Sequence, residues 1–258
     1  MNIMFALLPI IPLLLVASGA WLLGVLRNNV GIVDTCWPIF FMITTGIYLW
    51  TNPSGQSIAW IGLLMVFIWG LRLTIYVSFR NFGHREDRRY TEIRNRVGPG
   101  FNWKSLFMIF WFQAVFAWLL SAPLFVIAQS SAPISILHVG GLTLWIIGFL
   151  FETVADWQLL AFQRSSGNSD RVLNTGVWRY SRHPNYFGEF CVGWGLYLFA
   201  LPSGGWWTIF APLLLTYILL KFSGIARMEA GIDQRRPAYK DYSEETNAFF
   251  PGPPKTSR

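Results

Sequence analysis

The chain has 258 residues, of which 53% are hydrophobic, 17% are aromatic and only 13% are charged, with a net charge of +7 and a mean hydropathy of +0.42. This balance lies outside that of soluble domains and predicts an all-α, polytopic membrane protein that forms one domain over residues 1–258. The positive charge suits anionic membrane lipids and an anionic cofactor, whereas the sequence carries no soluble basic domain or reader motif for nucleic acid.

Apolar runs long enough to cross a hydrocarbon core of about 30 Å predict seven transmembrane helices. The first run has no basic leader and no small-x-small cleavage site, so we expect a retained helix and not a signal peptide. The sixth run is the shortest. In chain order the runs cover residues 3–26, 32–51, 58–79, 105–128, 134–157, 186–201 and 206–222.

Charge placement predicts the topology. The connections after the second, fourth and sixth runs hold no Lys or Arg, whereas the other connections and the C-terminal tail hold nearly all of the 20. By the positive-inside rule the N-terminus is outside and the C-terminus is cytoplasmic. We therefore expect an inner-membrane protein whose polar site faces the cytoplasm.

Ionisable residues inside predicted membrane helices are costly and commonly mark function. Arg72, Tyr76 and Arg80 recur every four residues on the third run, and Asp34 opens the second. The fifth run carries a further polar stripe, formed by Glu152, Asp156 and Gln163. We expect these stripes to converge on one cytoplasm-facing site. The alternative is a set of interhelical hydrogen bonds and ion pairs that only holds the bundle together.

The most polar part of the chain is residues 174–190, NTGVWRYSRHPNYFGEF. Pro184 suits the first turn of a helix that starts near His183. In that helix Arg182, Asn185 or Tyr186, and Glu189 share one face. The helix N-terminus beside Arg179 and Arg182 favours a phosphate group. A basic loop docking lipid headgroups is the simpler reading, but it does not explain Asn185 or Glu189.

The cysteine and histidine pattern predicts neither a metal site nor a disulfide framework. Cys36 and Cys191 lie in predicted helices with no ligand spacing around them, so both are expected to pack in the core. His138 stands alone in an apolar stretch and is expected to be packed. Only His183 has polar neighbours, and the sequence does not define its role.

The segment NTGVWRYSRHPNYFGE, with GIVDTCW upstream and RRPAYKDYSEETNAFFP near the end, resembles the bacterial branch of the steroid 5α-reductase family. The wider superfamily includes sterol C14 reductases and isoprenylcysteine carboxyl methyltransferases. The resemblance covers residues 29–251. It implies seven helices in a bacterial inner membrane, NADPH as cofactor, and hydride transfer to the carbon–carbon double bond of an enone such as a 3-oxo-Δ4-steroid.

The resemblance implies roles for individual residues. Asp156, Arg171, Asn185 and Glu189 match cofactor-binding positions, and Tyr186 is assigned to the same site. The arginines expected to face the cofactor phosphates are Arg80, Arg171, Arg179 and Arg182, with Arg164 as a further candidate. No G-x-G-x-x-G fingerprint is present, so the cofactor would be held by a non-Rossmann site.

Reduction of an enone places negative charge on the carbonyl oxygen, and the site needs a donor aimed at that oxygen. Tyr76 can supply a phenolic proton. Asp34, which we expect to have few counter-charges near it, could donate as a neutral acid. The family leads one to expect a Glu and Tyr pair, so Asp34 departs from its pattern.

The apolar, aromatic-rich outer half would accept a flat lipophilic substrate from the bilayer, and the protein is expected to act as a monomer. Two alternatives remain open. A methyltransferase that uses S-adenosylmethionine would share the polar segment but would not need Asp34 and Tyr76. A transporter or lipid-binding protein would usually show duplicated halves, and the sequence shows no repeat.

Overall fold

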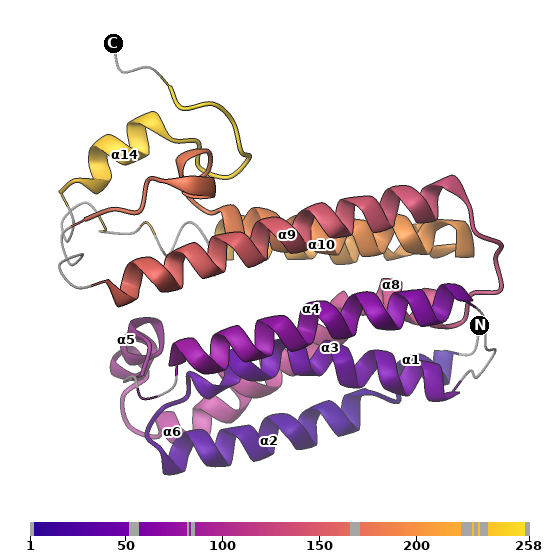
Figure 1. The fold of residues 1–258 in the computed structure, drawn as a ribbon. Coiled ribbons are helices and arrows are strands. Elements are labelled where there is room, and N and C mark those ends of the chain that lie inside the picture. The colour runs from indigo at the N-terminus through magenta and orange to yellow at the C-terminus, as the bar shows by residue number, and fades with distance from the viewer. Residues whose placement is uncertain are drawn as a thin grey trace. The chain divides into compact units, whose positions relative to one another are not determined.

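The computed structural model describes residues 3–51, 57–81, 83, 86–165, 171–222, 229, 232 and 237–255. Within these residues every regular element is helical. The chain forms two compact units (Figure 1), one of residues 1–134 with 203–205 and one of residues 135–202 with 206–258. Each unit is described by itself below.

Five helical stretches in the described residues are long and apolar enough to cross a membrane, which supports an integral membrane protein. They cover Met4–Leu26, Ile32–Thr51, Ser57–Asn81, Phe101–Leu120 and Ile136–Arg164. The other two predicted spans are shorter: α10, Pro184–Ala200, has 17 residues, and Gly205–Lys221 is a shorter apolar helix.

The first unit begins with α1, Ile3–Leu7, and α2, Ile10–Leu26, which were expected to be one helix. The break falls at Leu8 and Pro9. There the Ala6 carbonyl accepts hydrogen bonds from Tyr48 Oη at 3.1 Å and Trp118 Nε1 at 2.7 Å. The unit continues with α3, Ile32–Thr51, and α4, Ser57–Asn81, which pack together as expected for consecutive spans.

The fourth predicted span is segmented. It consists of α6, Phe101–Ser105, a π-helical turn at Leu106–Trp111, α7, Phe112–Leu120, and α8, Ala122–Ala128. Ser121 separates α7 from α8, and Pro123 occupies the first turn of α8, where its missing amide hydrogen costs nothing. The prediction of one uninterrupted helix over 105–128 was therefore wrong.

A helix outside the membrane spans, α5, Arg88–Val97, was not expected from the apolar pattern. Asp87 is its N-cap and accepts a hydrogen bond from the Arg89 amide, while Gly98 ends it with a positive φ of 64°. Glu86 fastens the start of α5 by accepting hydrogen bonds from the Val30 amide and from Arg94. Part-buried polar contacts thus help to place α5.

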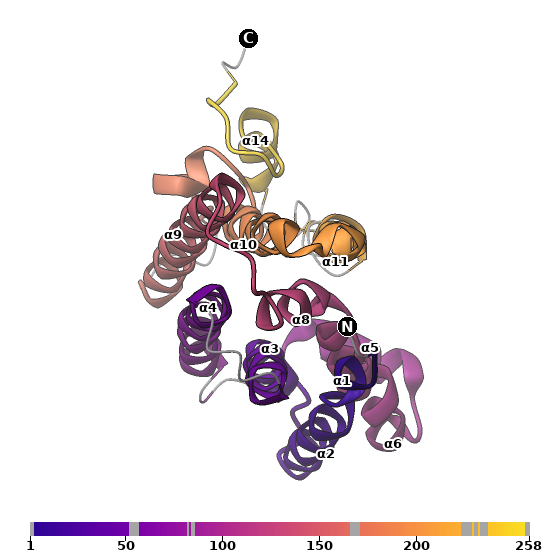
Figure 2. The same cartoon turned by 90° about the vertical axis from the view of Figure 1, so that its right-hand side faces the viewer.

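The second unit is built on α9, Ile136–Arg164, and α10, which run side by side (Figures 1 and 2). Figure 2 also shows α10 lying between α9 and α11, Phe210–Tyr217. A 3-10 turn at Gly176–Arg179 precedes α10, a π-helical turn at Ile218–Phe222 follows α11, and α14, Tyr239–Glu245, lies near the C-terminus.

Glycines set the distance between α9 and α10. A Cβ atom on Gly148 would lie 2.5 Å from the Gly188 carbonyl oxygen, and one on Gly188 would lie 2.7 Å from the Gly148 carbonyl oxygen. Gly141 and Gly195 repeat the arrangement seven residues away, with 2.8 Å to each other's carbonyl oxygen. Backbone touches backbone here, as in the close crossings that small residues allow in membranes.

Cys36, Cys191 and His138 are buried, as expected. His138 takes part in the first turn of α9, where its Nδ1 accepts a hydrogen bond from the Ser135 amide at 3.1 Å. Within the described residues no group of three or more His, Cys, Asp or Glu could hold a metal ion.

Candidate functional site

The polar segment folds as predicted at the start of α10. His183 is the N-cap of α10 and Pro184 is its first residue. The His183 amide donates to Ser181 Oγ at 3.1 Å, which fixes the chain just before the helix. The predicted helix start at His183 is confirmed.

The loop before α10 is pinned to the end of α9. Gly176 has a φ of +60°, and a Cβ atom there would lie 2.2 Å from Gln158 Nε2. Gln158 Oε1 accepts a hydrogen bond from the Val177 amide at 3.1 Å, and Trp178 Nε1 donates to the Ala155 carbonyl at 3.1 Å. Gln158 makes this contact, whereas Gln163, the predicted member of the stripe, is exposed.

Glu229 is the centre of a cluster at the start of α10. Its carboxylate accepts two hydrogen bonds from Arg182, at 2.7 Å from Nε and 3.0 Å from Nη2. His183 Nε2 lies 3.0 Å from Oε1 of the same carboxylate, and Tyr239 Oη donates to it at 3.1 Å. The His183 ring then stacks on Tyr186, with centroids 5.6 Å apart and an interplanar angle of 7°. We call these five side chains the Glu229 cluster.

The cluster keeps Glu229 ionised. Burial acts to raise the pKa of this carboxyl, but hydrogen bonds from His183 and Arg182 and the charge of Arg182 outweigh it and lower the pKa to about 2. A carboxylate with this many donors has its oxygens fully engaged. It orients its neighbours and is not free to act as a proton donor near neutral pH.

Arg182 also fastens the C-terminal segment. Its Nη1 donates to the carbonyls of Ser243 at 2.7 Å and Thr246 at 3.1 Å, and its amide donates to the Asn247 carbonyl. Tyr242 Oη adds a hydrogen bond to the Trp178 carbonyl at 2.6 Å. The guanidinium thus donates from all three nitrogens within the protein. The phosphate contact expected for Arg182 stays a prediction.

The other residues predicted for the cofactor fall into two groups. Asp156 is buried on α9, 4% exposed, and Asn185, Tyr186 and Glu189 are half-buried in the first two turns of α10. Next to Glu189, a Cβ atom on Gly188 would lie 2.6 Å from Cβ of Glu152, which is 3% exposed. The second group consists of the exposed arginines Arg164, Arg171 and Arg179.

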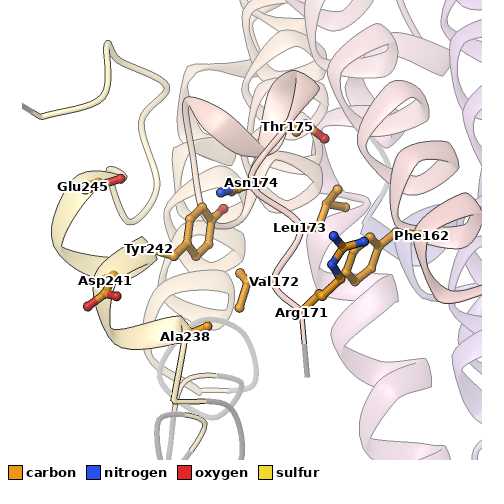
Figure 3. A pocket seen from close by; sticks show the side chains of 10 residues that line it. All are labelled: Phe162, Arg171, Val172, Leu173, Asn174, Thr175, Ala238, Asp241, Tyr242 and Glu245. Atoms are coloured by element: carbon orange, nitrogen blue, oxygen red, sulfur yellow. The ribbon is translucent and has the colours of Figure 1, made fainter. Parts of the chain in front are cut away.

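A cavity of about 590 Å³ lies beside the loop that leads to α10 (Figure 3). One wall is formed by Phe162 at the end of α9 and by residues 171–175, including Arg171. The opposite wall belongs to α14 and the residue before it, with Ala238, Asp241, Tyr242 and Glu245. Figure 3 shows the Arg171 and Tyr242 side chains on these two walls. The cavity thus contains one of the predicted cofactor residues.

Asp34, in the first unit, has more counter-charges than expected. Its carboxylate accepts hydrogen bonds from Arg89 Nη2 at 2.9 Å and Tyr90 Oη at 2.5 Å, and Arg80 Nη2 lies 3.9 Å away. Gln113 Nε2 approaches the same hydroxyl at 3.4 Å. The expectation of few counter-charges at Asp34 was wrong, because α5 brings an arginine and a tyrosine to it.

Tyr90 is buried and its hydroxyl is held in the neutral form. Burial raises the pKa of this phenol well above its ordinary value, and the neighbouring Asp34 charge raises it further. Its hydroxyl and the Arg89 and Arg80 guanidinium groups surround the carboxyl group of Asp34.

Tyr76 and Arg80 lie one turn apart on α4, as the stripe predicted. Arg80 Cζ lies 5.7 Å from the centroid of the Tyr76 ring, and its Nε donates to Asn81 Oδ1. The Tyr76 hydroxyl and the Arg72 guanidinium are buried within α4's polar stripe. The structure therefore brings Arg80 to both Tyr76 and Asp34.

Sequence reasoning missed Glu229, Arg89, Tyr90 and Gln158. Glu229 and Tyr90 lie in charged stretches outside the apolar runs, where a carboxylate or tyrosine is usually solvated. The sequence did carry a signal for Tyr90. The pattern RRYTEIRNRV of α5 is amphipathic and places its apolar residues on one helix face. No comparable signal marks Glu229, because its partners His183 and Arg182 lie 46 and 47 residues away in the sequence.

Comparison with known proteins gives a family for the chain. Residues 20–246 match a family described as "Protein of unknown function (DUF1295)". The chain belongs to the DUF1295 family. This family is related to the steroid 5α-reductase superfamily.

A further relative is "Uncharacterized protein C594.04c" of Schizosaccharomyces pombe, which is 29% identical over 266 residues, covering 90% of this chain and 75% of the relative. No solved structure matches the chain. The similarity therefore extends along nearly the whole chain to a yeast protein.

Proposed function

We propose that this DUF1295 protein is an integral membrane oxidoreductase that uses NADPH to reduce the carbon–carbon double bond of a lipophilic enone, of the 3-oxo-Δ4-steroid type. In this proposal the chain crosses a bacterial inner membrane seven times, with the N-terminus outside and the C-terminus and active site on the cytoplasmic side. α10 and Gly205–Lys221 are the sixth and seventh crossings.

One observation carries the proposal. The first two turns of α10 hold Asn185, Tyr186 and Glu189 at a glycine-lined contact with α9, beside the buried carboxylate of Glu152. Ionisable side chains within membrane helices are rare and commonly mark function. A nicotinamide nucleotide offers a carboxamide and ribose hydroxyls that match these donors and acceptors.

The proposal divides the cofactor contacts between two kinds of residue. Asp156, Asn185, Tyr186 and Glu189 bind the nicotinamide and ribose groups through hydrogen bonds. The exposed Arg171 and Arg179 meet the phosphates, and Arg80 of α4 is a third phosphate candidate. Arg182 is reassigned from a phosphate ligand to a residue that holds the C-terminal segment, because Glu229 and backbone carbonyls engage its guanidinium.

The proton donor in the proposal is Tyr76. Hydride transfer to the β-carbon of an enone develops negative charge on the carbonyl oxygen, and a phenolic hydroxyl can stabilise and protonate it. Asp34 keeps a role in catalysis by fixing Arg89 and Arg80 through the contacts of its carboxyl group.

The substrate class rests on the apolar surface that the helices present. Large hydrophobic side chains are exposed along the candidate spans, as lipid-facing residues are, so a lipophilic substrate would arrive from the bilayer. Membrane lipids are thus the natural surroundings of the protein, and a monomer suffices for the proposed site.

The experiment measures NADPH affinity in two variants and two matched controls. Asn185→Ala and Glu189→Ala each leave a cofactor group without a hydrogen bond, which costs about 1–3 kcal/mol and weakens binding by roughly five- to 150-fold. The controls Asn95→Ala and Glu244→Ala remove the same groups from exposed positions and should bind as the parent does. Normal NADPH affinity in both test variants would overturn the proposed site.

A further inference from the structure

The cavity between residues 171–175 and α14 is separate from the helix contact that carries the proposed nicotinamide site. We propose that this cavity holds the adenosine part of a nucleotide. Its volume of about 590 Å³ falls in the range of about 300–1,000 Å³ that is usual for small-molecule sites.

The cavity offers a flat apolar group a place to bind. Phe162 lies on one wall and Tyr242 on the other, and Val172, Leu173 and Ala238 add aliphatic surface. Aromatic and apolar side chains of this kind stack on a purine ring, worth about 1–3 kcal/mol per base. Asn174 and Thr175 supply donors and acceptors for the polar edge of the base.

The charged residues of the cavity match the rest of a nucleotide. Among the described lining residues Arg171 is the only basic one, and it can pair with a phosphate. Asp241 and Glu245, on the wall formed by α14, are acceptors only, so they suit ribose hydroxyls and repel a second phosphate placed near them. A free anion would face the carboxylates of Asp241 and Glu245 as well as Arg171. A nucleotide can instead place its ribose near the two carboxylates and a phosphate near Arg171.

The Glu229 cluster positions one wall of this cavity without lining it. Arg182 Nη1 holds the Ser243 and Thr246 carbonyls of the α14 region, and Glu229 orients Arg182. Tyr242, which lines the cavity, donates to the Trp178 carbonyl. Arg182 and Glu229 are therefore positioning residues for the proposed adenosine site.

This inference rests on the proposed function for the nucleotide itself, but the test is independent of the reaction. Adenosine is common to NADPH and S-adenosylmethionine, so the site would serve a reductase or a methyltransferase. Fragments that contain only adenosine and phosphate examine the cavity without hydride transfer. They separate failure of the site from failure of the reductase proposal.

The experiment titrates the purified full chain with 5′-AMP and with 2′,5′-ADP by calorimetry. We expect both to bind and to compete with NADPH. Arg171→Gln should weaken both by about ten- to 100-fold, the usual effect of losing a charged hydrogen bond. Arg96→Gln removes an exposed arginine from α5 and should leave both affinities unchanged.

A second variant separates positioning from general stability. Glu229→Gln should weaken 5′-AMP binding severalfold but leave the affinity for nicotinamide mononucleotide less affected. Arg182 holds the α14 region through two direct hydrogen bonds, whereas the cluster reaches the nicotinamide contacts only through the stacking of His183 on Tyr186. A variant that only destabilised the protein would weaken both ligands alike. Binding of NADPH without any binding of 5′-AMP would overturn the adenosine site and leave the reductase proposal intact. Binding of 5′-AMP without NADPH would support the site and overturn the reductase proposal.

Discussion

Each of the two units surrounds one carboxylate with arginine and tyrosine donors, but with different consequences. Asp34 is held by Arg89 and Tyr90, and Glu229 is held by Arg182, His183 and Tyr239. In the first unit the donors attach a polar helix, α5, to α3. In the second unit the donors hold the segment before α10 and, through Arg182, the α14 wall of the cavity. In both units the hydrogen-bonded carboxylate thus holds neighbouring segments together.

The helix contacts in the two units differ in how easily they could accommodate an added methyl group. In the second unit Gly148 and Gly188 bring α9 and α10 into backbone contact. In the first unit the atoms that a Cβ on Gly70 would meet first belong to the Met42 side chain, at 2.9 Å. A methionine can change rotamer, whereas a carbonyl oxygen in a helix cannot move away. The contact between α9 and α10 at Gly148 therefore tolerates an added methyl group less well than the contact at Gly70.

The largest effect is expected for Tyr76→Phe, which tests whether Tyr76 is the proton donor. The change removes one hydroxyl from the first unit and retains the ring, so NADPH affinity should stay nearly unchanged. Turnover of a 3-oxo-Δ4-steroid such as progesterone should fall by about two to three orders of magnitude, the usual effect of losing one oxyanion donor.

The measurement is NADPH oxidation in detergent or lipid, with Tyr217→Phe as the control because Tyr217 is exposed on α11. Full turnover in Tyr76→Phe would show that the donor lies elsewhere. Asp34→Asn should lower turnover less than Tyr76→Phe if Asp34 only fixes its neighbours.

A glycine pair tests this difference between the helix contacts. Gly148→Ala places a methyl group 2.5 Å from the Gly188 carbonyl oxygen and should destabilise the protein at the upper end of about 1–3 kcal/mol. Gly70→Ala should cost less than about 1 kcal/mol, since Met42 can yield and alanine favours the helix. Thermal unfolding in detergent measures both, and equal losses would contradict the comparison.

The smallest effect is a pH dependence of stability that comes from Glu229. Because its pKa is lowered to about 2 in the folded protein, the group stabilises the fold above its ordinary value of 4.5, and this contribution is lost as the pH falls towards 2. Glu229→Gln should lower the free energy of unfolding near neutral pH by about 1–3 kcal/mol.

Unfolding temperatures of the parent and Glu229→Gln should therefore converge between about pH 4.5 and pH 2. Glu244→Gln, an exposed carboxylate of α14, should show no such convergence. A constant gap between the parent and Glu229→Gln at every pH would mean that the hydrogen bonds of Glu229 do not depend on its charge.

The sequence predicted what depends on local pattern. Apolar runs located the five candidate membrane helices, and Pro184 after His183 located the start of α10, because both signals lie within a few residues. The break at Pro9 and the segmentation near Ser121 depend on neighbouring helices and were not predicted. Glu229 was missed for the same reason, since its donors lie far away in the chain. Asp34 was found as a polar residue but misjudged, because its counter-charge comes from α5.

The central claim is that the site at the start of α10 binds NADPH. Calorimetric titration of the purified protein with NADPH and, separately, with S-adenosylmethionine tests it most directly. The account predicts NADPH binding that weakens as salt concentration rises, since the phosphates meet exposed arginines whose charges are screened. Tight S-adenosylmethionine binding with no NADPH binding at any salt concentration would contradict it.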